Sequence, residues 1–269
     1  MRKSVFLCAI LAITTGMQFF TGCKSKTGGN EAVTTDSVKF DSKDSLVDVK
    51  YCIEYVKTGP EALINSVNEY ISEQLGDTYK GSMQSADSMI NYYAKAEYDT
   101  MKSDQQAIGK VENEMHFCSI YKIKKAWETN KLITFSDEVY NYTGGAHGMS
   151  GNSGCTFRKS DGRRFGSEIL KNTYDEGFTN LVKEGLKKYF SKATENKIES
   201  DDDLSDCLLD VKVYNIPMPQ CPPFLTKEGV TFVYQQYEIS AYAYGMPTFT
   251  IPYDKAKPYL IRAVRDLLN

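Results

Sequence analysis

Alternation of apolar and polar residues is the strongest constraint on how this 269-residue chain folds. In residues 47–56 an apolar side chain stands at almost every second position, with Asp, Lys and Glu between. A period of two places one side of a β-strand in a core and the other in water. Residues 111–125 and 132–142 carry the same pattern, and the Glu128-Thr129-Asn130 segment between them is typical of a turn. These three segments predict strands.

Two short hairpins are expected further along the chain. Residues 155–165 surround Ser160-Asp161-Gly162, in which Asp-Gly can supply the positive φ angles of a tight turn. Residues 224–234 surround Lys227-Glu228-Gly229 in the same way, and residues 248–251 predict one more strand.

Helices are expected where apolar residues recur every three or four positions. These segments are residues 60–75, opened by Pro60, then 83–104, 174–192 and 254–268. The third helix is expected to bury Phe178, Leu181, Val182, Leu186 and Tyr189. The acidic stretch 199–206 predicts a solvated loop. Without a regular βαβ alternation, the fold class is α+β, with antiparallel sheets and packed helices.

The N-terminus resembles a secretion signal. Residues 1–22 contain Arg2 and Lys3, followed by a nine-residue apolar run from Val5 to Ile13. That run is shorter than the ~20 residues that a membrane-spanning helix needs. The segment therefore predicts a signal peptide.

Cys23 is the expected lipidation site. Thr21-Gly22-Cys23 resembles the lipobox of bacterial lipoproteins, although Phe20 replaces the usual aliphatic residue. We expect an extracytoplasmic protein, anchored by lipid to a bacterial membrane, at the outer membrane or cell surface; plain secretion is the alternative. The small and polar residues 23–44 predict a flexible tether.

Composition excludes several classes of function. The net charge is −3 and no Lys/Arg stripe is present, so nucleic acid is not an expected partner. The only histidines, His116 and His147, cannot build a histidine cluster, and we expect neither a metal site nor a cofactor. Five cysteines follow Cys23, and because five is an odd number they cannot all pair as disulfides. Their spacing does not match a zinc site, so free thiols are favoured. A Cys207–Cys221 disulfide is the local alternative.

A glycine-rich segment stands out at the end of the strand predicted at 132–142. Gly144, Gly145 and Gly148 surround His147. Glycines permit positive φ angles and close backbone approach, so this loop can present His147. The alternative is a plain strand exit in which His147 bonds a neighbouring carbonyl.

The Tyr-Thr-Gly-Gly-Ala-His-Gly sequence at 142–148 resembles the signature of an extracytoplasmic family of unknown function. This family is shared by the lysozyme-sensing outer region of the anti-sigma factor RsiV and the non-catalytic N-terminal half of PdaC-type deacetylases. Similar segments follow in the family's order at 156–170, 224–232, 237–245 and 250–253. Gln236 and Ala241 replace two prolines of the family pattern, which is expected to loosen the aromatic loop.

The resemblance implies two tightly associated α+β subdomains, a PdaC-like one at 45–160 and an RsiV-like one at 161–269. It also implies binding rather than catalysis, because the deacetylase chemistry of PdaC-type proteins lies in a separate domain. The implied ligand is a lysozyme-like protein, or else a cell-wall or other glycan.

The expected binding site combines two segments about 90 residues apart, which we expect to lie together in the fold. Tyrosines offer a large, rigid contact area with a hydroxyl group, although core packing is an alternative role for them. The site residues are Gly144, Gly145, His147, Tyr237, Glu238, Tyr242 and Tyr244. The alternative function is a hydrolase of an envelope polymer that uses His147 with a carboxylate such as Glu238 or Asp137.

Overall fold

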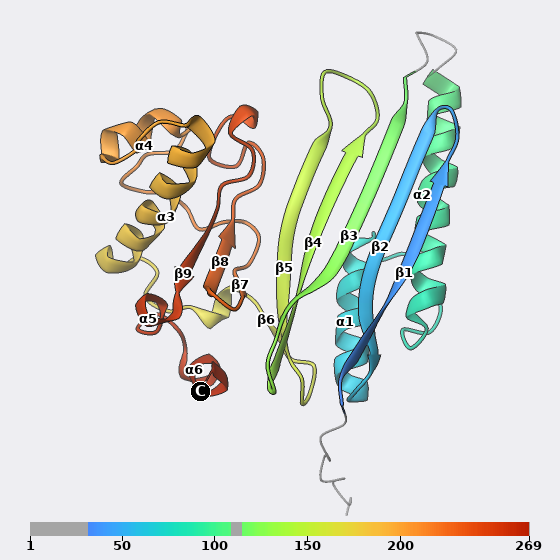
Figure 1. Cartoon of the computed structure of the whole chain (residues 1–269), viewed down its shortest axis with the longest axis horizontal. Helices are drawn as coiled ribbons and strands as arrows, with labels where there is room; N and C mark the ends of the chain where they lie inside the picture. The colour runs from blue at the N-terminus through green and yellow to red at the C-terminus, as the bar shows by residue number, and fades with distance from the viewer. Residues whose placement is uncertain (1–31, 109–114, 269) are drawn as a thin grey trace, which may run out of the picture. The chain divides into compact units, whose positions relative to one another are not determined.

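A computed structural model describes residues 32–108 and 115–268. Within these residues the chain forms six α-helices and two β-sheets (Figure 1), so the α+β class is confirmed. No helix in the described ranges is both long and apolar enough to cross a membrane. The predicted signal peptide and Cys23 lie outside the described residues.

The larger sheet has six strands in the order of the sequence. They are β1 (Thr34–Lys43), β2 (Val47–Thr58), β3 (Phe117–Glu128), β4 (Leu132–Tyr142), β5 (Met149–Arg158) and β6 (Arg164–Phe165). Neighbouring strands are antiparallel except β2 and β3, which are parallel, so this sheet is mixed. A parallel pair needs a crossover, and α1 (Glu61–Gln74) and α2 (Ala86–Ile108) provide it.

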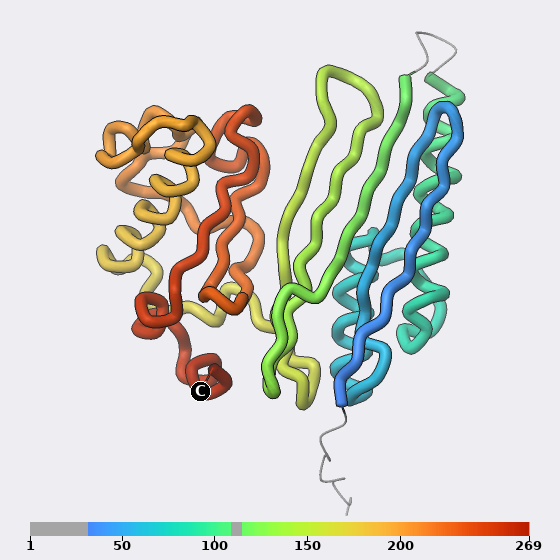
Figure 2. Tube along the Cα trace, viewed as in Figure 1, coloured from blue at the N-terminus to red at the C-terminus, as the bar shows by residue number. Residues whose placement is uncertain are grey.

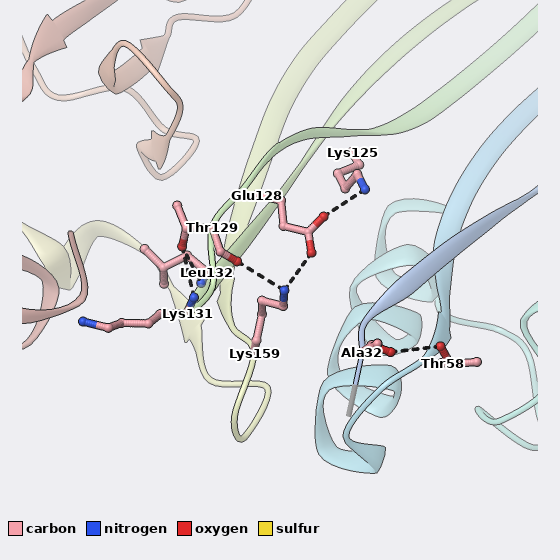
Figure 3. Close-up of polar contacts among 8 residues, drawn as sticks. All are labelled: Ala32, Thr58, Lys125, Glu128, Thr129, Lys131, Leu132 and Lys159. Carbon is pink, nitrogen blue, oxygen red and sulfur yellow. Dashed lines mark hydrogen bonds and ion pairs between the residues drawn. The ribbon is translucent and has the colours of Figure 1, made fainter. Parts of the chain in front are cut away.

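Strand β1 corrects the prediction of a flexible tether at 23–44 for residues 34–43, while residues 23–31 lie outside the described residues. Residues 34–43 pair with β2 along their whole length, and Val38 is buried between the sheet and its helices. The segment resembles a linker in sequence because an edge strand keeps its outward side chains polar. Ala32 precedes the strand, and its carbonyl accepts a hydrogen bond from Thr58 (Figure 3).

The first core lies between this sheet and helices α1 and α2. The alternating residues of β2 are buried as predicted, against apolar side chains of both helices. Helix α1 begins after Pro60, as expected. Strand β3 begins at Phe117 and runs to Glu128, so the predicted strand 111–125 is displaced toward the C-terminus; residues 111–114 lie outside the described residues.

The predicted turn between β3 and β4 is confirmed and is held by a small polar cluster (Figure 3). The Thr129 hydroxyl accepts hydrogen bonds from the backbone amides of Lys131 and Leu132. Glu128 pairs with Lys125 at 2.9 Å and with Lys159 at 2.7 Å. Partial burial alone would raise the pKa of Glu128, but hydrogen bonds and charge from the two lysines lower it below its usual value.

The predicted hairpin at 155–165 is also confirmed. It turns at Gly162, whose φ of +70° lies in the left-handed region. A side chain there would collide with the carbonyl oxygen of Ala62. Glycine is therefore required both by the turn and by the start of α1.

The smaller sheet consists of β7 (Phe224–Leu225), β8 (Gly229–Val233) and β9 (Thr248–Pro252), all antiparallel. Helix α3 (Glu176–Thr194) packs on it, and the Cα trace in Figure 2 follows this part to the C-terminal helix. Phe178, Leu186 and Phe190 of α3 form the second core with Phe232 and Ile251 of the sheet. Leu181 and Tyr189, both expected in this core, are half-buried at its margin, whereas Phe190 is fully buried in it.

Two predictions in the second half are wrong in detail. Most of the acidic stretch 199–206 lies in helix α4 (Asp201–Cys207) rather than in a loop, because Ser200 and Asp203 make a reciprocal capping box. The predicted closing helix is divided into α5 (Tyr253–Ala256) and α6 (Arg262–Leu268). Pro258 lies between them, where its missing N–H cannot continue a helix.

The five cysteines after Cys23 are free thiols, and no Cys207–Cys221 disulfide is formed. The described residues form one compact unit with two hydrophobic cores. The boundary at residue 160 between two subdomains stays a prediction.

Substitution Phe232→Ala is expected to lower the free energy of unfolding by about 3–5 kcal/mol, because this ring is fully buried. Leu181→Ala should cost only about 1 kcal/mol, since Leu181 is half-buried. Urea denaturation of both variants measures the difference. Equal losses would contradict the inward face assigned to α3.

Removal of β1 is expected to destabilise the protein. The free energy of unfolding of a chain beginning at Asp44 should be about 2 kcal/mol lower than that of a chain beginning at Ala32, because buried side chains of β2 would become exposed to solvent. If residues 34–43 were a tether, the two chains would melt alike.

Candidate functional site

The β4–β5 hairpin turns at the predicted glycine-rich loop. Gly144 and Gly145 have φ angles of +103° and +89°, which favour glycine. The Tyr142 hydroxyl donates a hydrogen bond to the Gly145 carbonyl at 3.0 Å. A Cβ atom at Gly144 would lie 3.2 Å from the sulfur of Met115. The two glycines therefore allow the tight turn that carries His147.

His147 stacks on Tyr242, which comes from the second half of the chain. The ring centroids are 3.8 Å apart with an interplanar angle of 21°. The Tyr242 hydroxyl donates to the Gly148 carbonyl at 2.9 Å. The glycine-rich loop and the 237–245 segment therefore lie together, as the sequence predicted.

Both nitrogens of the His147 ring have polar neighbours. Nδ1 lies 3.1 Å from the Gly148 carbonyl and Nε2 lies 3.4 Å from the Tyr237 hydroxyl. With the proton on Nδ1, His147 donates to the carbonyl and accepts from Tyr237. The ring thus bonds a neighbouring carbonyl, the alternative considered from the sequence, and also joins the two segments.

Two more aromatic side chains lie beside this stack, in which His147 is exposed and Tyr242 is half-buried. We call Tyr140, His147, Tyr237 and Tyr242 the aromatic surface. Tyr237 is 49% exposed and its ring lies 5.7 Å from that of Tyr242. Tyr140 is partly exposed and packs so close to Gly148 that a Cβ there would collide with its ring.

The backbone of Tyr237 adopts a φ of +65°, which is uncommon for a residue with a side chain. The turn is held because the Glu238 amide donates to the Gln235 carbonyl at 3.1 Å. Such strain persists only where neighbouring contacts fix it, and it points the Tyr237 ring at His147.

Two glutamine side chains attach this segment to β5. The Gln235 side-chain amide accepts from the Asn152 backbone N–H at 3.2 Å and donates to the Asn152 carbonyl at 2.7 Å. The Gln236 side-chain oxygen accepts from the Ser150 N–H at 2.8 Å. Gln235 therefore bonds β5 as a neighbouring strand would. It does so on the side of β5 that is not paired with β4.

A glycine in β5 also allows β7 to approach β5 closely. A Cβ at Gly154 would lie 2.8 Å from the ring of Phe224, so a side chain would push β7 away. Gln236 stands where the family pattern has proline. Its side chain adds a hydrogen bond to β5, and the expected loosening of the aromatic loop by Gln236 and Ala241 stays a prediction.

Glu238 and Tyr244 do not join the aromatic surface. The two carboxylate oxygens of Glu238 accept from the backbone amides of Gln220 and Gln235, each at 2.7 Å. The Tyr244 ring packs edge-on against Phe190, and its carbonyl accepts from Tyr189 at 2.6 Å. Both residues support the loop from behind.

The structure brings no carboxylate into contact with His147 in the described ranges. Glu238 is engaged by backbone amides. Asp137 lies in the middle of β4, hydrogen-bonded by the hydroxyls of Tyr70 and Ser153, and burial raises its pKa. Asp137 lies four residues before Asn141 on β4, roughly 13 Å from the end of the strand at which the loop with His147 begins. In the described part of the chain no cluster of three or more His, Cys, Asp or Glu side chains is placed to hold a metal ion.

Sequence reasoning missed Tyr140, Gln235 and Gln236. Tyr140 belongs to the same glycine-rich motif, so its closeness to His147 in the sequence was an available signal. Gln236 was noted only as a departure from the family's proline, and the contacts of both glutamines were missed because a side chain that bonds a distant strand leaves no periodic pattern.

The comparisons with known proteins agree with this organisation. Residues 42–150 match the family model described as Deacetylase PdaC, and residues 167–254 match the model described as Protein of unknown function (DUF3298). The expected family resemblance is thereby confirmed: a PdaC-like region is followed by a DUF3298 region. These two regions point to an envelope-associated protein of unknown function.

Solved structures share the fold. A DUF3298 family member from Bacteroides fragilis has a TM-score of 0.70 at 20% identity, covering 89% of this chain and 99% of its own. A DUF3298 family protein from Pseudomonas aeruginosa has a TM-score of 0.58 at 16% identity, covering 87% and 96%. No curated protein sequence gives a significant match.

Substitution Glu238→Gln is expected to lower the free energy of unfolding by about 1–3 kcal/mol, because an amide NH₂ would face a backbone N–H that the carboxylate now accepts. Glu228→Gln, at an exposed turn position, is the matched control. Chemical denaturation measures both. Equal stability of the two variants would show that Glu238 does not hold the loop.

Proposed function

We propose that this protein is a lipid-anchored, non-catalytic binding protein of the bacterial cell envelope. The aromatic surface is its binding site, and the ligand is a lysozyme-like protein or a cell-wall or other glycan. The observation that carries the proposal is the stacked His147–Tyr242 pair, which joins two distant segments at an exposed site.

The chemistry of the aromatic surface favours recognition. Tyrosine offers broad apolar contact together with a hydroxyl that can pair with a protein or a sugar. Hydrogen bonds and stacking hold these rings before a ligand arrives, so less conformational freedom is lost on binding.

The contacts of His147 support binding over hydrolysis. A general base needs hydrogen-bond reach to the proton it abstracts, and an orienting partner strengthens it. In the described part of the chain, His147 contacts the Gly148 carbonyl, the Tyr237 hydroxyl and the Tyr242 ring. None of these is a carboxylate that could orient the imidazole as in a catalytic His–carboxylate pair.

Substitutions His147→Ala and Tyr242→Ala are each expected to weaken binding of the same probe by about tenfold or more, mainly through faster dissociation. The probes are purified lysozyme and soluble peptidoglycan fragments, each measured by surface plasmon resonance. Tyr174→Ala is the control, because Tyr174 is 97% exposed and outside the aromatic surface.

Three results of this experiment would contradict the proposal. If neither probe binds to the natural protein, the proposed ligands are wrong. Unchanged affinity in both variants removes the site. Turnover of peptidoglycan by the natural protein but not by His147→Ala would establish the hydrolase instead.

The lipid anchor is tested separately. Cys23→Ser is expected to abolish incorporation of a fatty-acid probe, since the thiol is the acylation point of the lipobox that residues 21–23 resemble. Cys52→Ser is the control with an exposed thiol. Labelling that persists in Cys23→Ser would contradict the lipoprotein assignment.

A further inference from the structure

The smaller sheet has an open edge at β9. The strand order is β7-β8-β9, so β9 pairs with β8 alone. In an antiparallel strand, alternate residues direct their N–H and C=O groups to the opposite edge. A groove of about 780 Å³ runs along this strand, and all five residues from Thr248 to Pro252 line it. Because consecutive side chains point to opposite faces, what these five residues share is the backbone edge.

Helix α3 forms the other wall of this groove. The lining residues of the helix recur at helical spacing from Leu181 to Ala193. A side chain at Gly185 would collide with the ring of Phe249, so helix and strand are in close contact there. Figures 1 and 2 show α3 beside β9 in the described part of the chain. An edge strand flanked by a helix is an arrangement that can accept one more extended strand.

The charge of the groove is positive on a chain whose net charge is −3. Lys188, Lys192 and Lys255 line it together with one carboxylate, that of Glu184. Lys255 pairs with Glu184 at 3.2 Å. Among the described residues, Lys188 and Lys192 take part in no ion pair. Two lysines therefore remain to attract acidic groups.

We propose that the groove between α3 and β9 binds an extended acidic peptide as a fourth strand of the smaller sheet. Backbone hydrogen bonds to β9 supply affinity, and Lys188 and Lys192 select carboxylates on the peptide. Pro252, which has no N–H, ends the available edge. This site is separate from the aromatic surface and does not depend on its function.

Charge also argues against a second copy of the chain as the occupant. Pairing of two β9 edges would bring the lysines of both copies to one interface, and like charges at close range are unfavourable. Lysine and proline at an edge also prevent unwanted strand pairing. A purely protective role is therefore an outcome that the experiment must separate.

A displayed library of random peptides, selected on the full chain, tests the proposal. The expected result is enrichment of acidic sequences with alternating apolar residues. A selected peptide should bind about tenfold more weakly to Lys188→Gln/Lys192→Gln and to Ala193→Trp, which fills the groove. The control Lys171→Gln/Lys227→Gln removes the same charge from exposed positions outside the groove and should bind like the natural protein.

Backbone N-methylation of the selected peptide separates strand addition from simple charge attraction. Methyl groups on the alternate amides that face β9 should abolish binding, while the same number of methyl groups on the other alternate set should not, and the side chains are unchanged in both. Four results would overturn the proposal. The first is a selection without enrichment, which leaves only edge protection, and the second is equal binding of the peptide to the groove variants and to the control. The third is undiminished binding of the peptide methylated on the amides that face β9. The fourth is a concentration-dependent dimer of the natural protein that is lost in Ala193→Trp.

Discussion

The outer edge of β5 is the constraint on which the site depends. Strand β6 covers only its end, at Thr156 and Phe157, and an uncovered edge leaves backbone groups without partners. Two glutamine side chains, Gln235 and Gln236, supply these partners, and Gly154 lets the ring of Phe224 approach. The hydrogen bonds that cover the edge also bring the 235–245 segment to the β4–β5 hairpin.

That attachment accounts for the geometry of the aromatic surface. Once Gln236 is bonded to Ser150, the next residue, Tyr237, lies within reach of His147, and Tyr242 stacks on the same ring. Glu238 then bonds two backbone amides and keeps the turn closed. The exposed rings are therefore positioned by polar contacts on one side and by the second core on the other. A surface held in this way suits recognition, because its side chains lose little freedom on binding.

Much of this could be predicted from the sequence, and the misses have physical causes. Strand β4 matches its predicted bounds because turn residues limit both ends of a strong alternation. Strand β1 was missed because the polar, solvent-exposed residues of an edge strand resemble a linker, although the apolar residues Val38 and Phe40 alternate with polar ones within it. The parallel pairing of β2 with β3 joins distant segments, which local periodicity does not determine. The closeness of the Gly144–Gly148 loop to the 237–245 segment was expected from their glycine and tyrosine content, whereas the role of Gln235 depends on a contact visible only in the fold.

Hydrogen exchange of the β5 amides tests the central claim most directly. The amides of Ser150 and Asn152 are bonded by glutamine side chains, while those of Gly151 and Ser153 face β4 by alternation. The account predicts slow exchange at all four positions in the natural protein. In Gln235→Ala/Gln236→Ala, exchange should become fast at Ser150 and Asn152 alone. Rapid exchange of Ser150 and Asn152 in the natural protein would contradict the account, because the aromatic surface would then lack the attachment that positions it.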